Sequence, residues 1–189
     1  MGALKRILLV VLVCVSAVLH MSAGGWQPDV LGGGYEMRSV GHGSDYSGKV
    51  VSTIIRKTVA DSTATQRGVL YVHGFNDYFF NACMGDEFVA HGYDFYAVDL
   101  RKYGRSLQPG QHPFEARDIK EYYPDIDSAL VVMKDAGIDE IVLMGHSTGG
   151  LICACFIADN PDAPVDALIL NSPFLDWNLG WKERLVPMI

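Results

Sequence analysis

Hydrophobic positions follow two alternating spacings along the chain. Runs rich in apolar and β-branched residues, with the lengths of strands, predict a largely buried sheet. These runs are 49–59, 68–72, 93–99, 140–144 and 166–170. From 68 onward the strands are separated by segments with helical spacing, over about 79–91, 124–137 and 151–160. Short connections between alternating strands and helices predict an α/β fold, with a mostly parallel sheet and helices on both faces.

Local signals place the ends of the predicted helices. Phe80, Met84 and Phe88 recur at every fourth position, and Gly92 stands where a glycine commonly ends a helix. Pro124 suits the first turn of the second helix, because its missing N–H would have no partner there. We therefore expect the first helix to end before Gly92 and the second to begin near Pro124.

The N-terminus has the order of a secretory signal. Lys5 and Arg6 precede an apolar stretch, Ile7–Leu19, which is followed by the small residues at 22–24. That stretch spans about 20 Å as a helix, short of the ~30 Å hydrocarbon core of a bilayer. We expect a signal peptide at 1–23 and an exported protein, secreted or periplasmic; an uncleaved membrane anchor is the alternative.

The segment after the signal is rich in glycine and serine. From 24 to 48 it predicts an irregular lead-in with a short edge strand near Tyr35–Val40. The ordered α/β unit is expected from 49 to 174.

Composition excludes several classes of function. Fifteen Lys and Arg face 22 Asp and Glu, for a net charge of −7, so no basic field is available for nucleic acid. Four cysteines are too few for a disulfide scaffold. No metal-binding or dinucleotide motif occurs, so we expect no metal and no cofactor. Asp125, Asp127, Asp135 and Asp139 are interpreted as a solvated face of the second helix and its exit.

A possible nucleophile lies between a predicted strand and a predicted helix. Gly145-His146-Ser147-Thr148-Gly149 fits GxSxG, in which a sharp turn exposes the serine Oγ and the glycines let strand and helix approach. Ser147 is therefore the candidate nucleophile. The N–H of Thr148, at a helix N-terminus, is a candidate oxyanion donor.

Two further motifs follow earlier strands. His73-Gly74-Phe75 ends one strand, and Asp99-x-Arg101-x-x-Gly104-x-Ser106 ends the next. With the GxSxG turn, in this order and spacing, they resemble the α/β-hydrolase superfamily, most closely its serine aminopeptidase-like branch with monoacylglycerol lipases and lysophospholipases.

The resemblance implies a fold and a site. The fold would be an eight-stranded, mostly parallel sheet, of which 49–174 would form the N-terminal part and 175–189 the start of a lid. Ser147 would be the nucleophile, the backbone N–H groups of Phe75 and Thr148 would form the oxyanion hole, and Gly74, Gly145 and Gly149 would shape the loops. Lys102 departs from the glycine that most members have.

The rest of the catalytic triad is missing from the expected place. The family's order is serine, then acid, then histidine, but no histidine occurs in 148–189. His73, His146 and His112 are candidate bases with little support, and Asp176 is a weak candidate acid. We therefore expect a piece of a longer hydrolase, truncated before the C-terminal strands, and inactive and aggregation-prone by itself.

The predicted function is hydrolysis of carboxylic esters through an acyl-enzyme, on lysophospholipid or monoacylglycerol-like substrates, with a lid that could touch a membrane surface. A peptide hydrolase of the serine aminopeptidase type is one alternative. A non-catalytic binding protein with the same fold is the other. Composition and motifs predict no oligomeric state.

Overall fold

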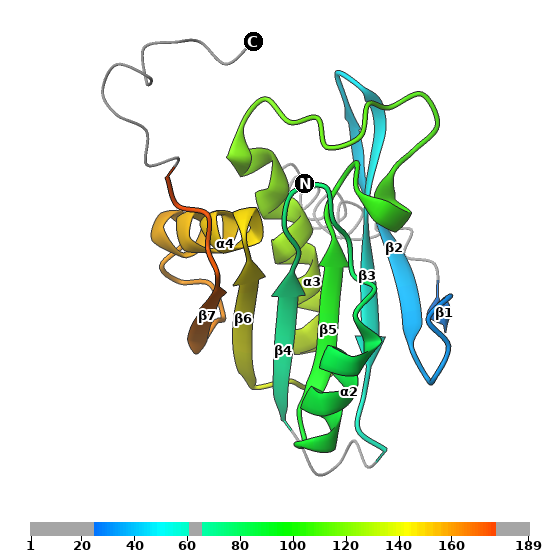
Figure 1. Ribbon diagram of the computed structural model, residues 1–189, viewed down its shortest axis with the longest axis vertical. Coiled ribbons are helices and arrows are strands. Elements are labelled where there is room, and N and C mark those ends of the chain that lie inside the picture. The colour runs from blue at the N-terminus through cyan, green and yellow to red at the C-terminus, as the bar shows by residue number, and fades with distance from the viewer. Residues whose placement is uncertain (1–24, 61–65, 177–189) are drawn as a thin grey trace, which may run out of the picture.

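The computed structural model describes residues 25–60 and 66–176. Within them, seven strands form one sheet in the order β1-β2-β3-β5-β4-β6-β7 (Figure 1). The strands are β1 (Gln27–Pro28), β2 (Glu36–Asp45), β3 (Gly48–Lys57), β4 (Arg67–Val72), β5 (Asp94–Asp99), β6 (Glu140–His146) and β7 (Ala167–Asn171). Strands β5, β4, β6 and β7 run parallel, whereas β1, β2 and β3 pair antiparallel. The α/β architecture predicted from the sequence is confirmed.

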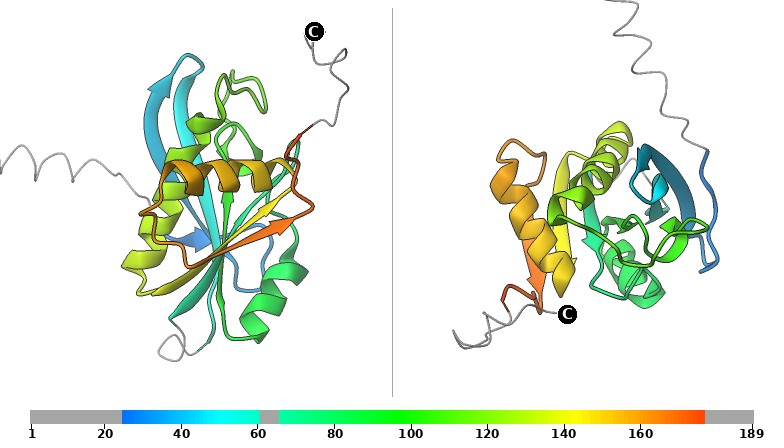
Figure 2. Two further views of the ribbon diagram at one scale, coloured as in Figure 1. Left: turned by 90° about the vertical axis from the view of Figure 1, so that its left-hand side faces the viewer. Right: turned by 90° about the horizontal axis from the view of Figure 1, so that it is seen from above.

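Helices cover both faces of the sheet. Helix α2 (Ala82–Ala90) packs on one face, and α3 (Tyr123–Asp135) and α4 (Thr148–Asp159) pack on the other (Figure 2). Two short 3₁₀ helices, η1 (Gly104–Ser106) and η2 (Ile119–Tyr122), lie in the connection from β5 to α3. Asn81 caps α2 by accepting from the Met84 N–H, and for this reason the helix starts three residues later than predicted.

The central strand β4 contributes side chains to two hydrophobic cores, one on each face of the sheet. Successive side chains of a strand point to opposite faces, so Leu70 and Val72 pack toward α3 and α4 while Val69 and Tyr71 pack toward α2. All four are buried. The doubly apolar pattern of this segment thus reflects a strand covered on both sides.

The N-terminal lead-in is more regular than predicted. Instead of an irregular segment with a short edge strand, 24–48 contains β1 and the ten-residue β2, which pairs with both β1 and β3. Glycines and serines in β2 hide the alternation, but Tyr35 and Val40 are buried. Pairing with β3 supplies the order that local propensity lacks.

The prediction of a buried strand at 166–170 is wrong in one respect. Strand β7 forms, but all five of its residues are exposed, including Leu168, Ile169 and Leu170 at 36 to 42%. Within the described residues β7 pairs only with β6, so its other edge carries unpaired backbone groups.

The solvated acidic face predicted for α3 is also wrong at Asp125. Its carboxylate is fully buried and accepts hydrogen bonds from the Arg101 backbone N–H and guanidinium at 2.8 to 3.1 Å. His42 Nε2 lies 3.2 Å from the same carboxylate. Asp125 therefore joins α3 to the loop after β5 and to β2.

The predicted signal peptide and nearly all of the predicted lid lie outside the described residues. In the part of the chain that the structure describes, no helix has both the length and the apolarity to cross a bilayer.

Candidate active site

Ser147 occupies the turn between β6 and α4. Strand β6 ends at His146 and α4 begins at Thr148, so one residue makes the whole reversal. Its backbone adopts φ 52° and ψ −122°. A positive φ is unfavourable for a residue with a side chain, and such strain clusters at functional sites. The geometry is that of the tight turn predicted for a nucleophile.

Glycines surround Ser147 because the backbones approach closely. A Cβ on Gly145 would lie 2.5 Å from the Gly149 carbonyl oxygen, and one on Gly149 would collide with the carbonyls of Val72 and His73. A Cβ on Gly74 would lie 3.0 Å from the Ser147 Cβ. The structure therefore brings all three glycines predicted from the motifs to the serine turn.

Backbone hydrogen bonds hold the turn in place. The Ser147 N–H donates to the Asn171 carbonyl at 3.1 Å, and the Ser147 carbonyl accepts from Gly150 and Phe174, both at 2.9 Å. Because Asn171 ends β7 and Phe174 follows it, the edge strand contributes directly to the position of the serine.

The two candidate oxyanion donors lie on adjacent strand ends. Val72 of β4 and Gly145 of β6 are partners in the parallel pair, and Phe75 and Thr148 each follow three positions later. Within the described residues, neither backbone N–H donates to a protein acceptor. Thr148 also begins α4, whose N-terminus favours negative charge. Both donors remain available to a developing oxyanion.

His73 is a structural residue. Its imidazole is fully buried, with Nδ1 2.8 Å from the Gly74 carbonyl oxygen and Nε2 accepting from the Leu100 N–H at 3.1 Å. These partners require the neutral ring, and burial lowers the pKa of His73. Both ring nitrogens are occupied, so His73 braces the loop that carries Phe75 and does not act as a base.

The other described histidines make no hydrogen bond to Ser147. His146 Nδ1 lies 3.2 Å from Asn171 Oδ1, and His42 binds Ser52 and Asp125. His91 is at the end of α2, bonded to Glu87, and His112 is exposed on the loop before η2. Asp176, the weak candidate acid, is exposed beyond β7. Among the described residues, the site brings together the candidate nucleophile and the two candidate oxyanion donors, and no histidine is bonded to Ser147.

A salt-bridged cluster supports the loop that follows His73. Asp99 accepts from the Phe79 N–H at 2.9 Å, while Arg105 donates to Asp99 at 2.9 Å and to Asp29 at 2.7 Å. Asp99 and Arg105, both within the Asp99–Ser106 segment, therefore have structural roles. Asp29, at the start of the fold, is a participant that the sequence pattern did not reveal.

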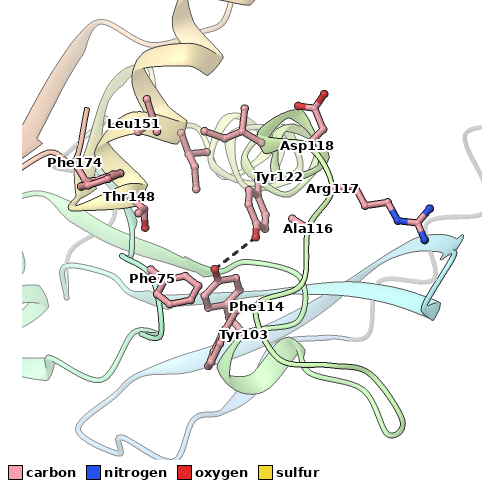
Figure 3. Close-up of a pocket in the computed structure, with 12 residues that line it drawn as sticks. Phe75, Tyr103, Phe114, Ala116, Arg117, Asp118, Tyr122, Thr148, Leu151 and Phe174 are labelled. Carbon is pink, nitrogen blue, oxygen red and sulfur yellow. Dashed lines mark hydrogen bonds between the residues drawn. The ribbon is translucent and has the colours of Figure 1, made fainter. Parts of the chain in front are cut away.

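An apolar cavity of about 280 Å³ opens beside the serine turn (Figure 3). It is lined by Phe75, Tyr103, Phe114, Ala116, Arg117, Asp118, Ile119, Tyr122, Thr148, Leu151, Ile152 and Phe174. Both candidate oxyanion residues belong to this wall. Most of the other lining residues come from the β5–α3 connection, whose irregular sequence gave no signal that would have identified them.

Comparison with known proteins places the chain in a family. The family described as Serine aminopeptidase, S33 matches residues 63–189, more than half of the chain. The AB hydrolase superfamily protein YisY of Bacillus subtilis is 32% identical over 108 residues, which cover 56% of this chain and 37% of that protein. The lysosomal thioesterase PPT2-B of Xenopus laevis is 30% identical over 121 residues, covering 62% and 39%. The chain thus spans about two fifths of the length of these relatives.

Solved structures agree on the fold. A carboxyl esterase from Bacillus coagulans superposes with a TM-score of 0.59 at 19% identity, over 71% of this chain and 43% of that one. A monoglyceride lipase from Saccharomyces cerevisiae gives a TM-score of 0.56 at 22% identity, over 69% and 42%. The sheet order, the serine turn and these matches lead to one assignment: the chain belongs to the serine aminopeptidase family of the α/β-hydrolase superfamily.

Proposed function

We propose that Ser147 is the nucleophile of an ester hydrolase that works through an acyl-enzyme. The observation that carries this proposal is the left-handed backbone of Ser147 beside an apolar cavity whose wall includes Phe75 and Thr148, two residues whose N–H groups have no protein acceptor within the described residues. These features serve acyl transfer and have no evident use in packing.

The chemical steps follow from this arrangement. Ser147 Oγ attacks the ester carbonyl, its proton passes to a base, and the N–H groups of Phe75 and Thr148 stabilise the tetrahedral oxyanion. Collapse expels the alcohol and leaves the acyl group on Ser147, and water then releases the acid. Lysophospholipid and monoacylglycerol-like esters are the lipid candidates, in keeping with the monoglyceride lipase and esterase among the structural neighbours.

The base is the missing part of this mechanism. No described histidine is bonded to Ser147, and the family order would put the acid and histidine after β7. We propose that residues 1–189 alone acylate slowly and do not turn over. An oxyanion hole without a working triad still accelerates acyl transfer by about 10³–10⁴ over water, so a single acylation of Ser147 remains measurable.

A peptide hydrolase is the second candidate, favoured by the description of the matching family. Such an enzyme needs an anionic group for the free amine of its substrate. Among the described residues that line the cavity, Asp118 is the one carboxylate, and it is adjacent in sequence to the cationic Arg117. An apolar ester is therefore the better fit to this wall.

The test is stoichiometric acylation with an activated ester. The 189-residue chain is incubated with 4-nitrophenyl butyrate, with and without imidazole as an external base, and the acyl group is located by peptide mass spectrometry. We expect one butyryl group on Ser147, formed faster with imidazole and absent in Ser147→Ala. Ser128→Ala, a change at a half-buried serine of α3 whose hydroxyl donates to the Pro124 carbonyl, is the matched control and should acylate like the wild type.

Equal acylation of the wild type and Ser147→Ala, or an adduct mainly on other residues, would contradict the proposal and favour a non-catalytic binding protein. A 4-nitroanilide of an amino acid that acylates Ser147 faster than the ester would favour the aminopeptidase.

We further propose export of the protein, because 1–23 has the charge, the apolar run and the small residues of a signal. Expression with a C-terminal tag should give an extracytoplasmic product shortened near residue 23. A cytoplasmic product that retains its N-terminus would contradict this.

A further inference from the structure

The cavity beside Ser147 has an aromatic wall with two hydroxyl groups in it. Tyr103 contacts Phe114 at a ring-centroid distance of 4.9 Å and Tyr122 at 6.1 Å, and Phe75 lies 5.4 Å from Phe114. Figure 3 shows the Tyr103 and Tyr122 hydroxyls directed toward one another across the pocket, on the side away from Leu151 and Phe174.

The Tyr103 and Tyr122 hydroxyls make only a long, weak hydrogen bond with each other. The two oxygens are 3.5 Å apart, at the outer limit for a hydrogen bond and well beyond the usual 2.7 to 2.8 Å. Each phenol carries one O–H donor, and one donor suffices for their mutual contact. No other partner is found for either hydroxyl within the described residues, so one donor is available to a ligand. Burial raises the pKa of both phenols, which keeps both protons in place at neutral pH.

The remaining polar side chains of the wall do not compete for this position. Arg117 extends away from the pocket in Figure 3, and Asp118 lies at its margin. Thr148 lies near Phe75, at the oxyanion end. From its Thr148 and Phe75 end, the cavity wall continues with aromatic side chains to the Tyr103 and Tyr122 hydroxyl pair.

The lining of the cavity favours an aromatic acyl group. Rings from Phe75, Tyr103, Phe114 and Tyr122 border about 280 Å³ of space. Aromatic rings in edge and tilted contacts favour an aromatic guest over an aliphatic one.

We propose that this cavity is a subsite for an aromatic acyl group that bears a phenolic or ether oxygen, read by the Tyr103 and Tyr122 hydroxyls. The inference rests on the proposed function for its link to Ser147, and it replaces the long acyl chain of the lipid candidates with a hydroxyaryl acid. The aromatic faces hold the ring, and the hydroxyl pair selects the oxygen at its far end.

Binding without turnover tests the subsite. The full chain with Ser147→Ala is titrated calorimetrically with methyl 4-hydroxycinnamate, methyl cinnamate and methyl decanoate. We expect the hydroxylated ester to bind about tenfold more tightly than methyl cinnamate, and methyl decanoate to bind weakest. Adding Tyr103→Phe and Tyr122→Phe together should reduce the tenfold ratio to about one and leave the affinity for methyl cinnamate within twofold.

Two controls keep the outcome interpretable. Tyr123→Phe removes a hydroxyl that bonds Asp159 outside the cavity, so the tenfold ratio should persist. Tyr122→Phe alone should lower the ratio and serves if the double variant melts early.

Equal affinities for the two cinnamates, a ratio unchanged in the double variant, tightest binding of methyl decanoate, or no binding of any ester would overturn the subsite. Because binding is measured in the Ser147→Ala chain, a loss of ester binding is distinguishable from a failure of the acylation test.

Discussion

Lys102 Nζ lies 3.1 Å from Asp45 Oδ2, although the lysine side chain is fully buried and its backbone φ is +64°. The ammonium also faces the Tyr46 ring at 4.1 Å, and Arg117 stacks on the same ring at 3.6 Å. These contacts join the β2–β3 turn to the β5–α3 connection, which forms the cavity wall. A position where glycine would be relaxed thus holds a lysine with a bracing role.

Two substitutions of Lys102 separate the cost of its strained backbone from the stabilisation given by its contacts with Asp45 and Tyr46. Lys102→Met keeps the left-handed residue but removes the charge, and we expect it to lower the free energy of unfolding by about 2 kcal/mol. Lys102→Gly loses the same contacts but relieves a strain of about 1 kcal/mol, so it should lie between wild type and Lys102→Met. Urea denaturation measures all three. A Lys102→Gly protein more stable than wild type would show that the strain outweighs the contacts.

The glycine at 149 should tolerate no side chain. Gly149→Ala would push a Cβ into the backbone carbonyls of Val72 and His73, neither of which can move without disturbing β4. We expect a loss of about 3 kcal/mol or more in thermal or urea unfolding. Gly41→Ala is the control, because a Cβ there meets nothing within 4 Å; its effect should stay within about 0.5 kcal/mol. Equal effects at the two positions would disprove the close approach.

Stability should fall in mild acid because of His42. Burial lowers the pKa of His42 below its ordinary 6.5; Asp125 opposes this shift and Arg101 adds to it. Since the folded state favours the neutral ring, its contribution is present above pH 6.5 and is lost as pH falls from 6.5 through the lower folded-state pKa.

The slope from one such group is at most about 1.4 kcal/mol per pH unit. His42→Gln should reduce the decline in unfolding free energy between pH 7 and 5, and His91→Gln, at an exposed helix end, should not. Identical slopes for wild type and His42→Gln would rule out this assignment. Burial also lowers the pKa of His73. This residue accounts for any dependence of the unfolding free energy on pH that persists in His42→Gln.

The exposed strand β7 should drive self-association of the 189-residue chain. Ile169 is 42% exposed on a strand whose outer edge is unpaired among the described residues. We expect sedimentation velocity to show concentration-dependent oligomers, and Ile169→Lys to shift them toward monomer, because a charge on an edge strand opposes pairing. Val131→Lys replaces a comparably exposed residue on α3 and should leave association unchanged. A wild-type chain that is monomeric at all concentrations would refute the prediction.

Sequence patterns were most informative where the chain determines structure locally. The glycines around Ser147, the cap at Gly92 with φ +79°, and Pro124 at the start of α3 each follow from backbone rules that one short segment obeys. The fold and the arrangement around Ser147 could therefore be predicted from motifs and their spacing.

What escaped prediction depends on distant partners. The acidic residues near Asp125 along the chain predict a solvated face, and only its bonds to Arg101 explain its burial. Strand β2 lacks a clear alternation and owes its order to β3. The Tyr103 and Tyr122 hydroxyls meet through an irregular connection that has no periodicity to interpret.

The serine turn and most of the cavity wall come from different segments of the chain, and this affects how the protein could diversify. The serine turn and the two candidate oxyanion amides follow the ends of β4 and β6, where the glycine contacts leave no room for a side chain. Most of the cavity wall comes instead from the β5–α3 connection, which is tied to the sheet mainly by side chains such as Lys102 and Tyr46. Mutation and insertion in that connection can reshape the cavity while the serine turn is kept, so the cavity lining should diverge between homologues faster than the turn itself.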